Sequence, residues 1–276
     1  MKADLHIHST YSDGTLSPAG IVSLAGEKGL SILGITDHDT ASHFPECIRE
    51  SRKSGMTVIP GVEFSTRFKD SELHIIGYAL DHKNRELRTH LHRVRSRRFE
   101  RAREIMARLA SRNVHIPEAE LDLAPEKATM GRMFIARLLF NHGYVRTIGE
   151  AFDRYLGSNG SAFVPYELTD ACEVIELIKK SRGVSVFSHP SRPELEAALD
   201  TLSEAGLEGI ELWRPAITRA LANTIKKKAL QHKLVLTGGS DWHHDSGWLD
   251  LGDFYVDKNR IADFLNLIAE KSPCAQ

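Results

Sequence analysis

The sequence predicts an α/β protein built as a barrel of alternating strands and helices. Short runs of β-branched and apolar residues recur along the 276-residue chain, and helix-like segments separate most of them. Such alternation is typical of βαβ units and a parallel sheet. About seven units in a chain of this length favour a closed barrel over an open sheet, with its functional site where strands end and loops begin.

The expected strands lie at 3–8, 32–36, 58–63, 73–79, 184–188, 209–213, 234–238 and 254–256. The expected helices between them lie at 17–28, 173–180, 193–204, 217–231 and 260–268. Histidine, aspartate or glutamate stands at the end of several of these strands, beside glycine or proline. This placement differs from the scatter over helix surfaces that is expected of histidines without a function.

One stretch, from about 83 to 160, breaks the alternation because it shows helical patterns and no convincing strand. We expect helices at 86–111, 132–140 and 148–155, and therefore a barrel in two parts, 1–82 and 161–276, with a helical insertion over 83–160. The first of these helices is strongly basic. It carries Arg88, Arg93, Arg95, Arg97, Arg98, Arg101, Arg103 and Arg108. Two interpretations stay open: a solvated face with i,i+4 ion pairs, or a cap that attracts a polyanionic substrate.

Composition excludes several classes of function. A net charge of −1 provides no global field for duplex DNA or a membrane surface. Cys47, Cys172 and Cys274 are an odd number without CxxC spacing, as expected of free thiols in a reducing compartment. No apolar run reaches membrane-spanning length, and no leader pattern begins the chain. We expect a cytoplasmic protein, a monomer or weak oligomer.

The clearest sign of chemistry is the segment Asp4-Leu5-His6-Ile7-His8-Ser9, followed by Asp13-Gly14. Side chains at i and i+2 of a strand share a face, so His6 and His8 project together. Two imidazoles on one face with a carboxylate shortly afterwards have the spacing of metal ligands.

Other strand ends supply residues of the same kind. They are Asp37, His38 and Asp39, then Glu63, His74, His189, Asp241 and His243. Each alone has an ordinary explanation as a helix cap, a buried histidine with its hydrogen bonds satisfied, or a loop carboxylate. Together they would bring many titratable groups to one rim, which is costly to bury without cations.

In these motifs the chain resembles the polymerase-and-histidinol-phosphatase (PHP) family of metal-dependent phosphoesterases. The matching segments are Asp4–Ser9, Ser12–Gly14, Ile35–Asp39, Pro60–Glu63, Ser188–Pro190 and Gly239–His243, in order and spacing. The resemblance covers 1–79 and 163–254. The helical insertion is similar to that of the branch that cleaves small nucleotides and RNA ends.

The resemblance implies a distorted (β/α)7 TIM-like barrel with three divalent metal ions. By position, the first ion takes His6, His8, Glu63 and Asp241. The second shares Glu63 and takes His74 and His189, and the third takes Asp13, His38 and His243. Asp37 and Asp39 would support the site by orienting His38 or a neighbour, while His244 and Asp245 flank the last ligands. Imidazole and carboxylate ligands suit Mn, Fe or Zn, of which we expect Mn.

In such a site a metal-bound hydroxide attacks phosphorus, so no protein nucleophile is needed. The resemblance places substrate phosphate against two arginines, Arg192 and Arg132. Arg137 and Arg214 are weaker candidates. For Arg132 and Arg137 the ordinary alternative is helix-surface solvation or a salt bridge. The chain has Met133-Phe134 where relatives carry Pro-His, which puts one substrate contact or proton donor in doubt.

Three functions remain from this sequence. The first is removal of the 3′-phosphate from a nucleoside 3′,5′-bisphosphate, which the mild net charge favours. The second is a 5′-to-3′ exoribonuclease acting on short 5′-phosphorylated RNA, which the basic helix supports. The third, of a different class, is a non-catalytic metal-binding regulatory module, although every ligand position is filled.

Overall fold

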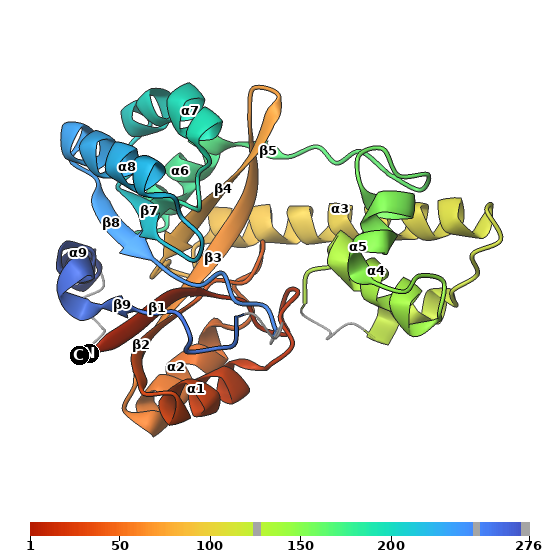
Figure 1. Cartoon of the computed structure of the whole chain (residues 1–276), viewed down its shortest axis with the longest axis horizontal. Coiled ribbons are helices and arrows are strands. Elements are labelled where there is room, and N and C mark those ends of the chain that lie inside the picture. Colours follow the sequence, from red (N-terminus) through yellow and green to blue (C-terminus); the bar gives the residue numbers. More distant parts are fainter. Residues whose placement is uncertain (124–127, 245–248, 272–276) are drawn as a thin grey trace.

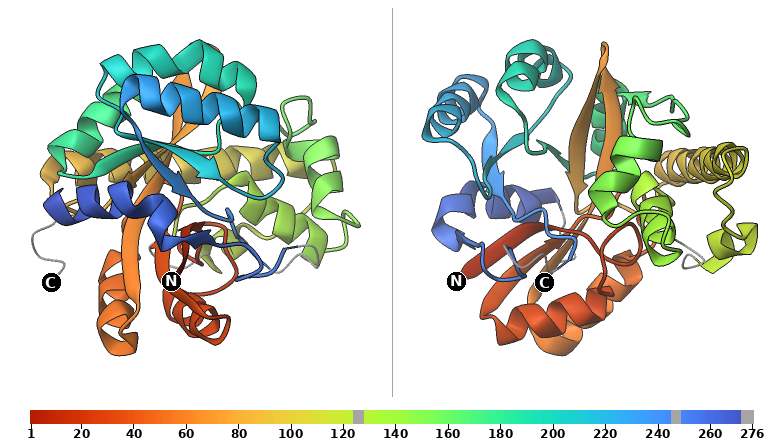
Figure 2. Two further views of the ribbon diagram at one scale, coloured as in Figure 1. Left: turned by 60° about the vertical axis from the view of Figure 1, so that its left-hand side comes forward. Right: turned by 45° about the vertical axis from the view of Figure 1, so that its right-hand side comes forward.

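A single mixed sheet organises the barrel (Figure 1). The structure, a computed structural model, describes residues 1–123, 128–244 and 249–271. Within these residues the sheet has nine strands in the order β8-β7-β6-β4-β3-β2-β1-β9, with β5 paired to β3. The sheet curves into a nearly closed barrel, and helices cover its outer face (Figure 2). The predicted α/β barrel is thereby confirmed.

The N-terminal part consists of parallel strands joined by helices. Its elements are β1 (Lys2–Ile7), α1 (Pro18–Glu27), β2 (Leu30–Ile35), α2 (Phe44–Ser54) and β3 (Thr57–Phe68). β2 pairs in parallel with both β1 and β3. Residues 3–7 of β1 are all buried, as expected of a parallel strand that is covered on both faces.

The expectation of a wholly parallel sheet was wrong at β4 (Ser71–Tyr78). This strand pairs antiparallel with β3, Glu63 facing Ile76 and Ser65 facing His74, and it pairs antiparallel with β6 (Val184–Phe187). The physical reason is the short connection, since Lys69 and Asp70 alone separate the two strands, and a parallel crossover needs a dozen or more residues. Lys69 takes a positive φ of 53°, which suits a two-residue hairpin turn.

The C-terminal part returns to alternation and closes the barrel. It contains β5 (Thr169–Asp170), α6 (Ala171–Lys180), β6, α7 (Arg192–Glu204), β7 (Gly209–Trp213), α8 (Arg219–His232), β8 (Val235–Gly238), β9 (Val256–Asp257), a 3₁₀ turn (Lys258–Ile261) and α9 (Ala262–Lys271). After β8 the chain reaches β1, where the His8 amide donates to the Trp242 carbonyl at 2.8 Å. This contact brings the first and last strand ends together on one rim.

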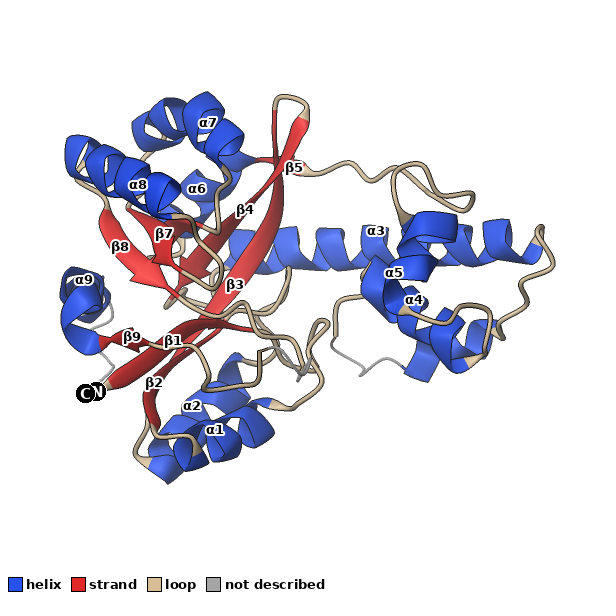
Figure 3. Ribbon diagram, in the orientation of Figure 1, coloured by secondary structure: helices blue, strands red, loops and turns tan. Residues whose placement is uncertain are grey.

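The insertion is helical and has its own core. It contains α3 (Arg85–Ala110), a 3₁₀ turn (Glu118–Leu123), α4 (Arg132–Asn141), α5 (Ile148–Ala151) and a π-helical turn (Phe152–Leu156). The first turns of α3 pack Leu87 and Leu91 into the barrel core, whereas its C-terminal half contributes Ile105 and Leu109 to a second core shared with residues of α4. The long helix therefore connects the two cores (Figure 3). Among the described helices, none is long and apolar enough to cross a membrane.

Candidate metal centre and substrate pocket

The first predicted ligand set converges on one point of the rim. The Nε2 atom of His6 lies 3.1 Å from His8 Nε2, 3.2 Å from Glu63 Oε2 and 3.3 Å from Asp241 Oδ1. Ligand atoms of all four residues lie within 4.8 Å of one another. They come from β1, β3 and the segment after β8, which is why closure of the barrel is needed to form the set.

The second predicted set surrounds the other oxygen of Glu63. Its Oε1 atom lies 3.0 Å from His74 Nδ1 and 3.0 Å from His189 Nε2, and these two nitrogens are 3.2 Å apart. The antiparallel hairpin brings His74 here, because β4 runs back beside β3. His38 also approaches, with Nδ1 3.3 Å from Glu63 Oε2.

The third predicted set gathers around Asp13. Its Oδ1 atom lies 3.3 Å from His243 Nε2, and its Oδ2 atom lies 3.9 Å from His38 Nε2. His8 joins these three, since its ligand atom lies within 4.8 Å of theirs. The nine residues predicted as metal ligands thus lie together in three groups that share Glu63, His8 and His38.

Strained backbone supports this arrangement. His189 and Asp241 have positive φ angles of 29° and 57°, which residues other than glycine rarely adopt. Gly239 permits the close approach that closes the site, because a Cβ atom there would lie 2.4 Å from the backbone nitrogen of His6. Strain of this kind costs free energy and persists where the surrounding structure fixes the conformation.

The two supporting aspartates do different things. Asp37 is buried and accepts hydrogen bonds from the Ser9 amide at 2.8 Å and from the Ser12 hydroxyl at 2.7 Å. It thereby holds the loop that carries Asp13. Asp39 accepts from the Ser65 amide at 3.1 Å and forms an ion pair with Arg98. Neither carboxylate contacts His38 through a described hydrogen bond.

Glu211, in the middle of β7, was not predicted from the sequence. This buried carboxylate accepts from the His189 amide at 2.8 Å and from the Ser188 hydroxyl at 3.2 Å, and it lies 3.3 Å from His6 Nδ1. A partner at Nδ1 fixes the ring so that Nε2 faces the site. A charged residue inside the apolar strand Gly-Ile-Glu-Leu-Trp is the signal that could have identified it.

The groups perturb one another's pKa values strongly. Burial lowers the pKa of His6, but the negative charges of Glu63, Asp241 and Glu211 outweigh it and raise that pKa well above its usual range. Burial also lowers the pKa of His8 and of His74, but the carboxylates around them outweigh it and raise both pKa values to about 10. Burial raises the pKa of Glu63, but the imidazoles around it hold that pKa well below its usual range. Burial instead lowers the pKa of His38 to about 4, so the imidazoles of the cluster do not all carry the same charge.

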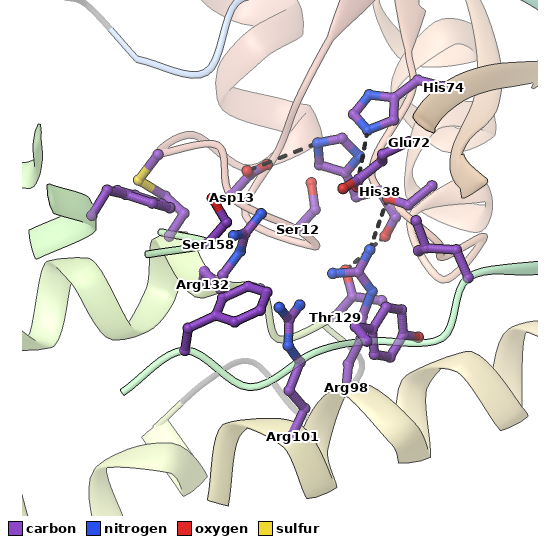
Figure 4. Close-up of a pocket in the computed structure, with 17 residues that line it drawn as sticks. Ser12, Asp13, His38, Glu72, His74, Arg98, Arg101, Thr129, Arg132 and Ser158 are labelled. Atoms are coloured by element: carbon purple, nitrogen blue, oxygen red, sulfur yellow. Dashed lines mark hydrogen bonds and ion pairs between the residues drawn. The ribbon is translucent and has the colours of Figure 1, made fainter. Parts of the chain in front are cut away.

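A cavity of about 510 Å³ lies between this rim and the insertion (Figure 4). One wall carries Asp13, His38 and His74. The insertion contributes Arg98 and Arg101 from α3 and Arg132 from the start of α4, and Phe152, Phe163 and Tyr166 add aromatic surface. Arg132 was predicted to contact substrate, whereas Arg98 and Arg101 were named only as part of the basic helix of a possible cap and were not singled out among its arginines.

The other three predicted arginines do not line this cavity. Arg192 lies on the outside of the barrel, 3.4 Å from Glu196 and 3.3 Å from the Thr224 hydroxyl. Arg137 donates to the Asp13 carbonyl at 2.5 Å, and Arg214 donates to the Pro190 carbonyl at 2.7 Å. Arg137 and Arg214 therefore hold backbone beside candidate ligands. Of the other residues named from the sequence, Asp245 and Cys274 lie outside the described residues.

Comparison with known proteins identifies the family. The PHP domain model matches residues 4–156. A 5′-3′ exoribonuclease of Haemophilus influenzae is 32% identical over 91% of this chain and 93% of its own length. The chain belongs to the PHP domain family. Within the family it is also 26% identical to the 3′,5′-nucleoside bisphosphate phosphatase of Chromobacterium violaceum, over 87% of this chain and 86% of that one.

The fold of a relative with a solved structure agrees closely with the fold of this chain. The crystal structure of a protein described as a metal-dependent phosphoesterase, from Bifidobacterium adolescentis, superposes with a TM-score of 0.87 at 27% identity and covers 96% of both chains. The PHP family, the solved neighbour and the clustered ligands together make this chain a metal-dependent phosphoesterase.

Proposed function

We propose that this chain hydrolyses the bond between phosphorus and the 3′-oxygen of a nucleotide that also carries a 5′-phosphate. The small form of this substrate is a nucleoside 3′,5′-bisphosphate, which yields a nucleoside 5′-monophosphate and inorganic phosphate. The observation that carries the proposal is the cavity, because candidate metal ligands form one wall and three arginines lie across from them.

The three groups of candidate ligands are suited to binding divalent cations. Asp13 Oδ1, His38 Nδ1 and Glu63 Oε2 are buried and have ionic neighbours at 3.1–3.3 Å, but none of the three makes a well-aligned hydrogen bond to a described residue. Each belongs to one of the three groups, and buried polar atoms in native proteins are rarely left unsatisfied. We propose three ions, held by the predicted sets, and Mn as the metal, since mixed imidazole and carboxylate donors suit it as well as Fe or Zn. When bound, such ions supply an activated water and neutralise charge on the phosphoryl oxygens.

The chain's own side chains provide binding and orientation. Arg132 opens α4, packs over the Phe152 ring and donates to the Leu156 carbonyl at 3.3 Å, which holds its guanidinium in the cavity. Arg101 donates through Nε to the Val164 carbonyl at 2.9 Å and keeps its remaining donors for a ligand. Planar guanidinium groups match the oxygens of a phosphate, so these two residues are suited to the 5′-phosphate.

A second candidate, a 5′-to-3′ exoribonuclease, is favoured by the relatives. Three curated exoribonucleases are 32–33% identical over about nine-tenths of this chain, against 26% for the bisphosphate phosphatase. The chemistry is shared, since the first nucleotide of a 5′-phosphorylated RNA differs from the bisphosphate only in carrying the rest of the chain on its 3′-phosphate. The third candidate, a non-catalytic regulatory module, is disfavoured because these relatives are enzymes.

The test uses Mn-loaded protein and three substrates: adenosine 3′,5′-bisphosphate, adenosine 3′-monophosphate and a short 5′-phosphorylated RNA. Chromatography of the products should show AMP from the bisphosphate and 5′-mononucleotides from the RNA, with the 3′-monophosphate hydrolysed at least about tenfold more slowly because its contact with the arginines is missing. Equal rates on both adenosine substrates would contradict the role of the arginines. No turnover of any of them would overturn the proposed function.

A further inference from the structure

A second cavity, of about 800 Å³, lies at the N-terminal end of α3 and is not used by the proposed reaction. One side is the segment after β2, including Asp39, Thr40 and Ser42. The other side is the beginning of the insertion, where Lys83, Arg85, Arg88, His92 and Arg95 line it. Along the helix, residues 85, 88, 92 and 95 repeat at intervals of three and four, so they share one face of α3.

The charge of this cavity is strongly positive. Its lining includes four Lys or Arg side chains and, among the described residues, Asp39 as the single acid. Asp39 is already neutralised, because its carboxylate is paired with Arg98 and accepts from the Ser65 amide. Lys83, Arg85 and Arg88 form no ion pair within the described part of the chain. A polyanion would therefore meet three cations, Lys83, Arg85 and Arg88, that no described carboxylate compensates.

The two cavities are neighbours along one helix. Arg98 lines the first cavity and is paired with Asp39, which lines the second. From Arg88 to Arg98 the helix rises by about 15 Å, at about 1.5 Å per residue. Arg88 and Arg95 line the second cavity and Arg98 and Arg101 line the first, so cations of one helix line both cavities.

We propose that this second cavity binds the phosphate backbone of single-stranded RNA, on the 3′ side of the nucleotide that occupies the first cavity. The inference rests on the proposed function, because the RNA end must lie against the candidate metal ligands. A nucleoside bisphosphate is too short to reach beyond Arg98, so the second cavity contributes only to the binding of longer substrates.

The lining predicts how the RNA is recognised. Guanidinium and ammonium groups, together with the hydroxyls of Thr40 and Thr89, recognise phosphate oxygens. No Phe, Tyr or Trp is present among the described lining residues, so the cavity offers no aromatic platform for stacking bases. Binding should depend on length and salt and should be independent of sequence.

The experiment compares Arg85→Ala/Arg88→Ala with a control, Arg97→Ala/Arg103→Ala, which removes the same charge from the same helix outside both cavities. For each protein, kcat/KM is measured on adenosine 3′,5′-bisphosphate, a 5′-phosphorylated dinucleotide and a 5′-phosphorylated octanucleotide. We expect the cavity variant to lose about tenfold or more on the octanucleotide and to match the control on both short substrates. The slope of log(kcat/KM) against log(salt) should become shallower by about 1.4 on the octanucleotide, as expected when two phosphate contacts are lost from a single strand.

A second measurement separates this inference from the proposed function. Fluorescence anisotropy of the labelled octanucleotide with metal-free protein reports binding without turnover, and the cavity variant should bind more weakly than the control. If the wild type turns over the bisphosphate while both variants handle the octanucleotide alike, the inference is overturned and the proposed function stands. If the wild type hydrolyses none of the substrates, the proposed function fails, and equal anisotropy of the two variants then overturns the inference as well.

Discussion

The barrel rim and the helical insertion face the same cavity but contribute different chemistry to it. The rim contributes histidines and carboxylates, of which His6, His8 and Glu63 are buried and most of the others are partly buried. The insertion contributes Arg98, Arg101 and Arg132, and of these only Arg98 forms an ion pair with a carboxylate among the described residues, that of Asp39. Ligands that hold several cations must be fixed to fractions of an ångström, which strand ends achieve, whereas a substrate phosphate tolerates a more loosely placed partner.

The insertion also holds the rim in place. The Thr129 hydroxyl donates to the His38 carbonyl at 2.6 Å, and Arg137 donates to the Asp13 carbonyl at 2.5 Å. Arg98 is paired with Asp39, next to His38. Each contact is made to a segment that carries a candidate ligand of the third group. The comparison therefore predicts that rim variants abolish chemistry, whereas insertion variants change stability or substrate affinity.

The largest effect should come from Glu63→Gln. This side chain contacts candidate ligands of all three groups, so its neutralisation should cut kcat by at least about a thousandfold and lower the metal content. The measurements are turnover of the bisphosphate and metal analysis of the purified protein, with circular dichroism to verify the fold. Asp153→Asn, at an exposed position of the insertion, is the matched control. Full metal content and full activity in Glu63→Gln would show that the Glu63 carboxylate is not needed to hold the metal ions.

Arg98→Ala should mainly reduce stability. It leaves the buried Asp39 carboxylate without its cation, and breaking such a pair costs about 3 kcal/mol or more in the free energy of unfolding. Urea unfolding measures this loss. The double variant Arg98→Ala/Asp39→Asn should recover a large part of it, because no uncompensated charge remains. An unchanged unfolding midpoint in Arg98→Ala would show that the insertion does not hold the rim.

Metal binding should release protons and tighten as pH rises. In the metal-free protein the carboxylates raise the pKa of His8 and of His74 to about 10, above the ordinary value of 6.5, so both are protonated at neutral pH. A ligand must lose that proton, so affinity for Mn should rise by about tenfold per pH unit for each proton displaced, up to about pH 10. Calorimetry of Mn binding at pH 7.5 in two buffers of different ionisation enthalpy counts the protons released. An identical heat in both buffers would contradict the charged state of the metal-free cluster.

The smallest effects separate the arginines from one another. Arg132→Ala should raise KM for the bisphosphate by about tenfold, because it removes one charge-assisted contact to phosphate. Arg192→Ala should leave KM within about twofold, since this side chain lies on the barrel surface beside Glu196. Steady-state kinetics of the two variants measure these changes in KM. A large rise in KM for Arg192→Ala with none for Arg132→Ala would reverse the assignment.

The sequence was a good guide to the rim and a poor guide to the insertion, for a physical reason. His6, Glu63 and Asp241 stand in or after apolar runs, and parallel strands of a barrel end on one rim, so local pattern and topology agree on where these three lie. His74 follows another rule, because it lies within the antiparallel strand β4. No such rule places an arginine on a helix, where the chain's many cations look alike until the packing of α3 is known. Arg98 and Arg101 were not singled out for that reason, and Arg192 was placed at the substrate although it lies outside the cavity.

Two other features, the β3–β4 hairpin and Glu211, were not predicted from the sequence for a similar reason. The antiparallel β3–β4 hairpin depends on a two-residue turn at Lys69 and Asp70, which the alternation of strands and helices elsewhere obscured. Glu211 was missed because a single acid within a strand of five residues shows nothing of its partners, which come from β1 and from the segment after β6. Contacts between segments far apart in the chain are not encoded in local periodicity.

The most direct test of the account is a crystal structure of the Mn-loaded protein, with anomalous scattering recorded at the manganese edge. The account predicts three anomalous peaks on the rim: one among His6, His8, Glu63 and Asp241, one beside Glu63, His74 and His189, and one among Asp13, His38 and His243. A structure with manganese bound elsewhere, or with no peak among these residues at saturating metal, would contradict it.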